Sequence, residues 1–176
     1  MQGVDLAEYT AKLRYTHLLA GIIHQEEEKI MQTWLKLIGS DKVPITGAPF
    51  YGNYKVEYVG FRKTRKPSVR LGDYLFLYAP GGTKSIFALA EAASDPQINA
   101  QYNPEEEGSC YWNVSVRYLI NLPVDSGIHI DEIGTNQRNL LQSIQRQSHI
   151  KLSHEESELA LHKLQSKVKE YKIVRH

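Results

Sequence analysis

Five basic side chains lie close together in one short stretch of this sequence. The eleven residues from Gly60 to Arg70 contain no acidic residue and five basic ones, namely Arg62, Lys63, Arg65, Lys66 and Arg70. Guanidinium and ammonium groups pair with phosphate oxygens, so the stretch is a candidate phosphate-binding surface. A solvated surface loop is the alternative interpretation of the same charges.

Aromatic side chains are the second feature that could bind a ligand. The chain has eleven tyrosines against four phenylalanines and two tryptophans, and a ring with a polar end suits a half-exposed surface or a pocket. Phe50 and Tyr51 stand in the Pro- and Gly-rich segment Pro44–Tyr54, and Tyr102 stands in a polar loop. Rings stack on nucleobases with roughly 1–3 kcal/mol per base. Together with the basic stretch, and with Glu91 in an apolar strand, they predict a nucleobase pocket.

The sequence lacks the common local motifs of catalysis and of metal binding. The chain has no Gly-x-Ser-x-Gly nucleophile elbow and no His-x-x-Glu-His or His-Glu-x-x-His arrangement of zinc ligands. The Gly81–Lys84 turn lacks the spacing of a phosphate loop. We expect the lone Cys110 to be a packing residue rather than a nucleophile. We expect His129–Glu132 to be polar surface rather than a metal site. These features favour a binding module without metal or cofactor over an enzyme, with a small nucleotide-processing enzyme of dispersed catalytic residues as an alternative.

Length, composition and charge are those of an ordinary globular chain. Its 176 residues, 41% hydrophobic and 23% charged, predict one domain over residues 1–176, with residues 1–15 as a candidate N-terminal helical extension. The formal net charge of +1 excludes nucleic-acid binding through overall basicity, so any polyanion site is local. One cysteine excludes an internal disulfide, and neither a membrane-spanning run nor a secretory signal is recognisable, so we expect a cytoplasmic protein.

The elements that position these residues begin with an ambiguous N-terminal region. The apolar run within Thr16–His24 fits either a buried strand, which we favour, or a helix. Acidic residues followed by apolar residues at helical spacing predict a helix over Glu26–Ile38. After the loop Pro44–Tyr54, the segment Tyr54–Phe61 predicts a strand that leads into the basic stretch.

The centre of the chain predicts antiparallel strands. Tyr74–Ala79 alternates aromatic with aliphatic residues, and Ser85–Ala93 follows it after a Pro-Gly-Gly turn. Tyr111–Leu122 alternates between an apolar and a more polar face. The three segments predict a small antiparallel β-barrel or sheet.

The C-terminal part of the chain predicts helices. Asn139–Gln147 has helical periodicity, and Ser153 with Glu156 fits a capping box at the start of a last helix. The buried face of that helix is predicted to carry Leu161, Leu164 and Val168. The fold class is therefore α+β, with helices at the periphery of the sheet.

Four segments in series resemble the EVE domain family of the PUA-like superfamily. They match the family's Gly-Asp strand, its Ala-Glu strand, its tryptophan-led strand and its late Arg-Gln-Ser segment, and are Arg70–Tyr78, Ile86–Ala92, Trp112–Val116 and Arg146–Ser148. The likeness covers about Leu71–Leu164, more than half of the chain. The sequence departs from the family at its start, where the family has an aromatic-rich first strand. Either the run Thr16–His24 takes the place of that strand, or the strand is missing.

The resemblance implies a PUA-like pseudo-barrel that captures a flipped, modified base in an aromatic pocket, as the related YTH and SRA readers do with methylated bases. Flipping costs a few kcal/mol, which stacking and hydrogen bonds to the base edge must offset. The five basic residues of Gly60–Arg70 would then hold phosphates. The residues expected at the base pocket are Trp112, Tyr111, Ser148, Tyr51, Phe50 and Trp34.

These features favour a non-enzymatic reader of a methylated or hydroxymethylated base, in DNA rather than RNA, that serves as the recognition part of a modification-dependent restriction system. Its expected partners are nucleic acid and an effector nuclease or NTPase domain, and not a membrane. The alternatives are an RNA-binding module without base specificity and a protein-interaction module that uses the terminal helices.

Overall fold

The structure, a computed structural model, describes residues 31–39, 55–81, 84–134 and 138–174, all within the compact unit Met31–His176. The predicted segments 1–15 and 16–24 and the predicted pocket residues Phe50 and Tyr51 lie outside the described residues. The elements are β1 (Thr33–Leu37), β2 (Tyr58–Phe61), β3 (Tyr74–Ala79), β4 (Ser85–Ala92), β5 (Gln97–Ile98), β6 (Trp112–Asn121), the 3-10 helix η1 (Val124–Ser126), β7 (Ile128–His129), the 3-10 helix η2 (Ile130–Ile133), α2 (Leu140–Gln145), β8 (His149–Lys151) and α3 (His154–Val174).

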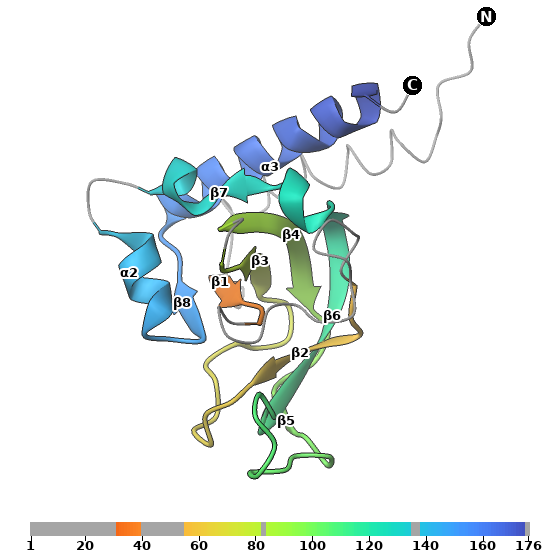
Figure 1. The fold of residues 1–176 in the computed structure, drawn as a ribbon, viewed down its shortest axis with the longest axis vertical. Helices are drawn as coiled ribbons and strands as arrows, with labels where there is room; N and C mark the ends of the chain where they lie inside the picture. Colours follow the sequence, from red (N-terminus) through yellow and green to blue (C-terminus); the bar gives the residue numbers. More distant parts are fainter. Residues whose placement is uncertain (1–30, 40–54, 82–83, 135–137, 175–176) are drawn as a thin grey trace, which may run out of the picture. The chain divides into compact units, whose positions relative to one another are not determined.

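The strands form one curled sheet in the order β2-β6-β4-β3-β1-β8, with β5 paired to β6 and β7 to β4. All pairs are antiparallel except β1 and β3, which run parallel with Trp34 opposite Leu75. The strands curl around a common interior (Figure 1), and no pairing among the described strands joins β2 to β8. The α+β class with peripheral helices is thus confirmed.

The sheet differs in two respects from the small antiparallel barrel that was predicted. It is mixed, and in the described residues it is a half-barrel. A parallel pair requires a crossover connection. The chain supplies one here, because between β1 and β3 it passes through β2 at the far edge of the sheet.

Two hydrophobic cores lie on the two sides of the sheet. The inner core, enclosed by the curl, takes Leu75 and Leu77 of β3, whereas the helix-side core, beneath α2 and α3, takes Phe76 and Tyr78 of the same strand. Successive residues of a strand point to opposite faces, so the predicted alternation in Tyr74–Ala79 separates two buried faces. The aromatic face is therefore covered by helices rather than exposed to a ligand.

The helix predicted over Glu26–Ile38 is wrong for its described residues, because Thr33–Leu37 form strand β1. Trp34 and Leu35 are both buried, Trp34 in the inner core and Leu35 in the helix-side core. Only a period of two brings consecutive residues into cores on opposite faces. The helical spacing of the apolar residues in this segment therefore did not reflect its conformation.

The other predicted strands are confirmed within a few residues. Strands β3 and β4 pair as an antiparallel hairpin, and β6 extends over ten residues, Trp112–Asn121. The strand predicted over Tyr54–Phe61 begins later, at Tyr58, and its residue Tyr54 lies outside the described residues.

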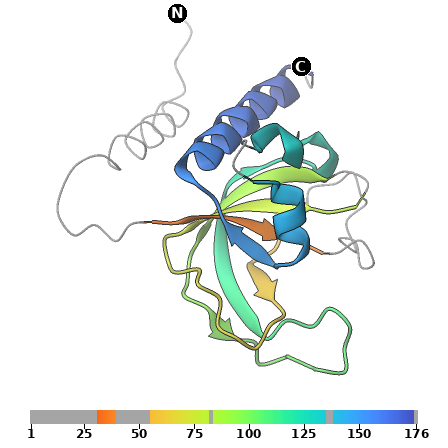
Figure 2. The ribbon, with the colours of Figure 1, turned by 90° about the vertical axis from the view of Figure 1, so that its left-hand side faces the viewer.

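Both C-terminal helices begin at a side-chain cap, and the cap of α3 is the one that was predicted. The Asn139 side chain accepts from the amide of Gln142 at the start of α2. At α3, Glu156 accepts from the Ser153 amide at 2.8 Å while the Ser153 hydroxyl accepts from the Glu156 amide at 3.1 Å, which is the predicted capping box. Leu164 is fully buried, and α3 lies across one end of the half-barrel over β4 and β7 (Figure 2). Among the described helices, none has the length and apolarity to cross a membrane.

Candidate nucleic-acid interface

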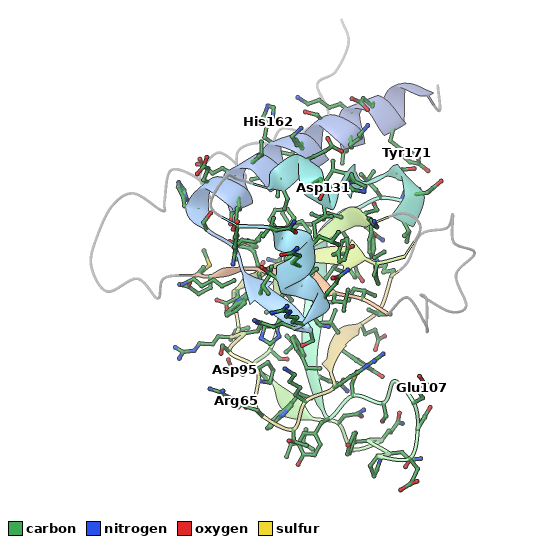
Figure 3. All side chains as sticks on the ribbon, turned by 60° about the vertical axis from the view of Figure 1, so that its left-hand side comes forward. Arg65, Asp95, Glu107, Asp131, His162 and Tyr171 are labelled. Carbon is green, nitrogen blue, oxygen red and sulfur yellow. The ribbon has the colours of Figure 1, made fainter. Side chains whose placement is uncertain are left out.

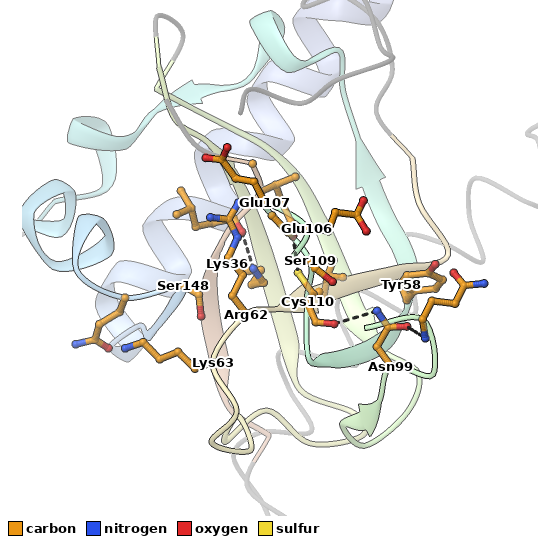
Figure 4. Close-up of a pocket in the computed structure, with 18 of the residues that line it drawn as sticks. Lys36, Tyr58, Arg62, Lys63, Asn99, Glu106, Glu107, Ser109, Cys110 and Ser148 are labelled. Carbon is orange, nitrogen blue, oxygen red and sulfur yellow. Dashed lines mark hydrogen bonds between the residues drawn. The ribbon is translucent and has the colours of Figure 1, made fainter. Parts of the chain in front are cut away.

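A cavity of about 630 Å³ opens at the ends of β1 and β2. Four segments line it, which are the end of β1, strand β2 with the two residues that follow Phe61, the loop between β5 and β6, and the turn between α2 and β8. Figure 4 shows Lys36, Arg62 and Cys110 gathered at its centre, with Lys63 and Ser148 on one side and Tyr58 on the other. The cavity thus joins parts of the chain that are far apart in sequence.

Lys36 lies at the floor of this cavity in the middle of an apolar strand. The residue is 4% exposed, its Nζ donates to the Leu37 carbonyl at 2.6 Å, and the same atom lies 4.7 Å from the centre of the Phe61 ring. The pKa of Lys36 is lowered from 10.5 to about 8, mainly by burial; Cys110 offsets part of this shift, and the nearby Arg62 contributes to it. At neutral pH the cavity floor therefore carries a buried positive charge.

His149 lies beside Lys36 at the start of β8. Its ring packs against Trp34 and Phe61, with centroid distances of 5.3 and 5.0 Å, and its Nδ1 lies 3.1 Å from the Ser148 hydroxyl. Burial, together with the positive charges of Lys36 and Lys63, lowers the pKa of His149 from 6.5 to about 4. The imidazole is therefore neutral at pH 7 and adds no charge to the site.

This lowered pKa predicts a loss of stability in acid. Because His149 in the unfolded chain binds a proton near pH 6.5 and in the folded chain only near pH 4, the free energy of unfolding should fall as pH drops from 6.5 to 4. In His149→Phe this contribution should vanish. Urea unfolding of the wild type and of His149→Phe between pH 4 and pH 6.5 would measure this contribution. His162→Gln, at an exposed position of α3, is the control and should keep the wild-type profile. An identical acid profile in the wild type and in His149→Phe would contradict the assignment.

The five basic residues predicted to bind phosphates divide into two groups. Arg62 and Lys63 line the cavity, and Arg65, Lys66 and Arg70 lie outside its wall. All five are exposed, and none forms an ion pair with an acidic side chain among the described residues. Arg65 lies at the end of the domain away from α3, whose His162 and Tyr171 mark the opposite end (Figure 3). The basic stretch therefore borders the cavity and extends beyond it.

The Trp112 ring lies beside the basic stretch but outside the cavity wall. Its indole N–H donates to the Thr64 carbonyl at 2.9 Å, and Lys66 Nζ lies 5.9 Å from the ring centre. Tyr111 contacts Trp112 edge-on and also contacts Tyr102, so the three half-exposed rings form one cluster, the β6 ring cluster. Whether these rings bind a base remains a prediction.

Among the remaining predicted pocket residues, Ser148 is at the cavity and Trp34 is in the core. Ser148 lines the wall, and its carbonyl accepts from the Leu37 amide at 2.9 Å. Trp34 is 8% exposed, and its indole N–H donates to a carboxylate oxygen of Asp73 at 2.9 Å. The packing and hydrogen bond of Trp34 give it a structural role.

The cavity residues that sequence reasoning missed include Lys36, Tyr58 and Cys110, which is a neighbour of Lys36. Tyr58 is 49% exposed at the start of β2 and lines the cavity with its ring. The signal for Lys36 was present, because it interrupts the apolar run Trp34–Ile38. A lysine in an amphipathic helix lies on the polar face, and only as part of strand β1 does Lys36 become a buried charge.

Two other polar groups singled out in the sequence have partners within the sheet and its connections. Glu91 pairs with Arg117, which stands opposite it on β6. His129 and Glu132 form a capping box for η2, with the His129 amide donating to Glu132 at 2.9 Å. In the part of the chain that the structure describes, no group of three His, Cys, Asp or Glu residues is arranged to hold a metal ion.

No family model matches the sequence, and no curated protein matches it. Solved structures with a similar arrangement include Rpa0253 from Rhodopseudomonas palustris, with a TM-score of 0.49 and 15% identity over 76% of this chain and 93% of that one. A hypothetical protein from Leishmania major has a TM-score of 0.49 and 14% identity over 77% and 96% of the two chains. A mutant of ZmASCH from Zymomonas mobilis has a TM-score of 0.42 and 16% identity over 72% and 92%. At these identities nothing about the function of this chain follows from them.

Proposed function

We propose that this chain is a nucleic-acid-binding module that takes a nucleotide into the cavity at the ends of β1 and β2. The observation that carries the proposal is the position of Arg62 and Lys63, which bring the basic stretch to the wall of a cavity of about 630 Å³. Pockets for small molecules typically span roughly 300–1,000 Å³. A flipped nucleotide fits such a volume while the neighbouring phosphates meet the basic side chains outside.

Recognition of a modified base is the finer part of the proposal. The exposed ring of Tyr58 offers a face on which a base can stack at the cavity, and stacking is worth roughly 1–3 kcal/mol per base. Ser148 adds a hydroxyl at the wall. The resemblance of the four sequence segments to the EVE family favours a reader of a modified base in DNA rather than RNA. We also favour binding over catalysis.

Binding of matched oligonucleotides tests this function. The full chain is titrated with plain single and double strands, and with strands that contain methyladenine, methylcytosine or hydroxymethylcytosine, at two salt concentrations. Salt-sensitive binding that is tighter for one modified strand is the expected result. Equal affinity for plain and modified strands would contradict recognition of a modified base. No binding to any strand would overturn the proposed function as a whole.

Two variants separate phosphate contacts from base contacts. Lys63→Ala should weaken plain and modified strands alike and lower the salt slope by about 1, because a phosphate contact carries no sequence information. Tyr58→Ala should weaken the modified strand more than the plain one, by roughly 1–3 kcal/mol. Fluorescence anisotropy measures both. Lys169→Ala, an exposed lysine of α3, is the charge-matched control, and an effect as large as that of Lys63→Ala would falsify the placement of the interface.

A further inference from the structure

Lys36 carries a buried charge for which the described residues supply no carboxylate partner. Its ammonium group contacts a carbonyl oxygen and an aromatic face, and among the described residues no carboxylate forms an ion pair with it. A buried cation is costly unless it is paired. The apolar strand β1 would pack equally well with methionine at this position, so packing alone does not require the lysine.

Among the groups around Lys36, Arg62 adds positive charge, and Cys110 offsets it in part. Arg62 faces it from the end of β2 and Cys110 from the loop before β6, while His149 on β8 is neutral at pH 7 because its pKa is lowered to about 4. A β-carbon placed on Gly108 would lie 3.6 Å from the Arg62 guanidinium, so this group reaches the opposite wall of the cavity. The cavity therefore has a cationic floor and a second cation across its width.

The acidic side chains at the cavity come from the same opposite wall. Glu106 and Glu107 belong to the loop between β5 and β6 and line the cavity. Neither forms an ion pair with Lys36 or Arg62 in the described part of the chain, and both are exposed. Solvent screens exposed charges, so they offset the buried ammonium only weakly.

We propose that the cavity binds an oxyanion of the nucleic-acid ligand, a carboxylate or phosphate group, which accepts hydrogen bonds from Lys36 at the floor and from Arg62 at the wall. The inference rests on the proposed function for the identity of the ligand. A methyl group on a base cannot compensate a buried ammonium, whereas a charged acceptor forms a short, charge-assisted hydrogen bond with it. The two sources of such a group are a terminal phosphate of a strand and an acidic substituent on a base.

Thymidine and thymidine 5′-monophosphate serve as probes, because they differ only in the oxyanion. Isothermal titration at pH 7 should show binding of the monophosphate and at least tenfold weaker binding of thymidine. Lys36→Met should abolish the difference while circular dichroism shows a folded chain, and Lys169→Met should retain it. Raising the pH from 7 to 9.5 should weaken binding of the monophosphate by about tenfold, because the lysine loses its proton above a pKa of about 8.

Oligonucleotides then identify the source of the oxyanion. Strands with a 5′-phosphate or a 5′-hydroxyl end test the terminal phosphate, and strands with cytosine or 5-carboxycytosine at one internal position test the acidic base. A preference that Lys36→Met removes, in either comparison, supports the proposal. Equal affinity within both pairs, or equal binding of thymidine and its monophosphate, overturns it.

The two proposals fail in distinguishable ways. If oligonucleotides bind with a salt slope that Lys63→Ala lowers, but no oxyanion preference depends on Lys36, the proposed function stands and the oxyanion site is wrong. If the monophosphate binds through Lys36 and no oligonucleotide binds, the oxyanion chemistry stands and the nucleic-acid function is wrong.

Discussion

Replacing Asp73 with alanine should lower the free energy of unfolding by about 3 kcal/mol, because three donors lose their acceptor. The Asp73 carboxylate is 3% exposed and accepts from the Gln32 amide at 3.0 Å, from the Trp34 indole at 2.9 Å and from the Arg70 amide at 2.9 Å. It thereby joins the start of β1, the end of the basic stretch and the start of β3. Asparagine has nearly the same shape as aspartate, but Asp73→Asn should not restore the stability, since its amide nitrogen would face an N–H donor.

Urea unfolding at pH 7 measures this effect. Asp95→Ala is the matched control, because Asp95, in the connection between β4 and β5, is an exposed carboxylate that accepts from the Leu71 amide of the turn before β3 at 3.0 Å. Its loss should change the free energy of unfolding by less than about 1 kcal/mol. Equal effects of the two substitutions would show that the burial of Asp73 does not matter.

Lys36→Met should act in the opposite direction and stabilise the protein by about 2 kcal/mol at pH 7. The gap between a pKa of 10.5 in the unfolded chain and about 8 in the folded chain corresponds to about 3 kcal/mol. Loss of the donor to the Leu37 carbonyl offsets about 1 kcal/mol of this gain. A residue that lowers stability where methionine would fit is expected at a binding site.

The pH dependence distinguishes this cause from better packing. The unfolded chain binds a proton at Lys36 below pH 10.5 and the folded chain only below about 8, so the penalty is complete below pH 8 and disappears as pH rises to 10.5. The advantage of Lys36→Met should therefore shrink over that range in paired unfolding curves. Lys169→Met, at an exposed position of α3, should stay within about 0.5 kcal/mol of the wild type. A constant advantage of Lys36→Met at all pH values contradicts the lowered pKa.

Local patterns predicted those elements whose neighbours in sequence are also their neighbours in space. The hairpin of β3 and β4 follows from alternation around a short turn, and the start of α3 follows from Ser153 and Glu156, which lie three residues apart. Strand β1 could not be predicted in this way. Its parallel pairing with β3 and antiparallel pairing with β8 join distant parts of the chain, and burial on both faces overrode a helical spacing of apolar residues.

The candidate site was predictable in its charges but not in its geometry. Arg62, Lys63 and Ser148 were predicted and line the cavity. Trp34 was predicted at a pocket, but it packs in the inner core and donates to Asp73. Lys36 was not predicted, because a lysine signals a functional position only once its strand is known to be buried on both faces.

The sequence by itself determined the α+β class, the central hairpin, the C-terminal helices with the cap of the last one, and the local basic stretch, because each depends on residues a few positions apart. Only the tertiary structure decided that the sheet is a mixed half-barrel, that Trp34 is a core residue and that Lys36, Arg62, Lys63 and Ser148 share one cavity. Burial, pKa and the convergence of side chains depend on contacts between segments distant in the chain, and these arise only when the sheet curls around its core.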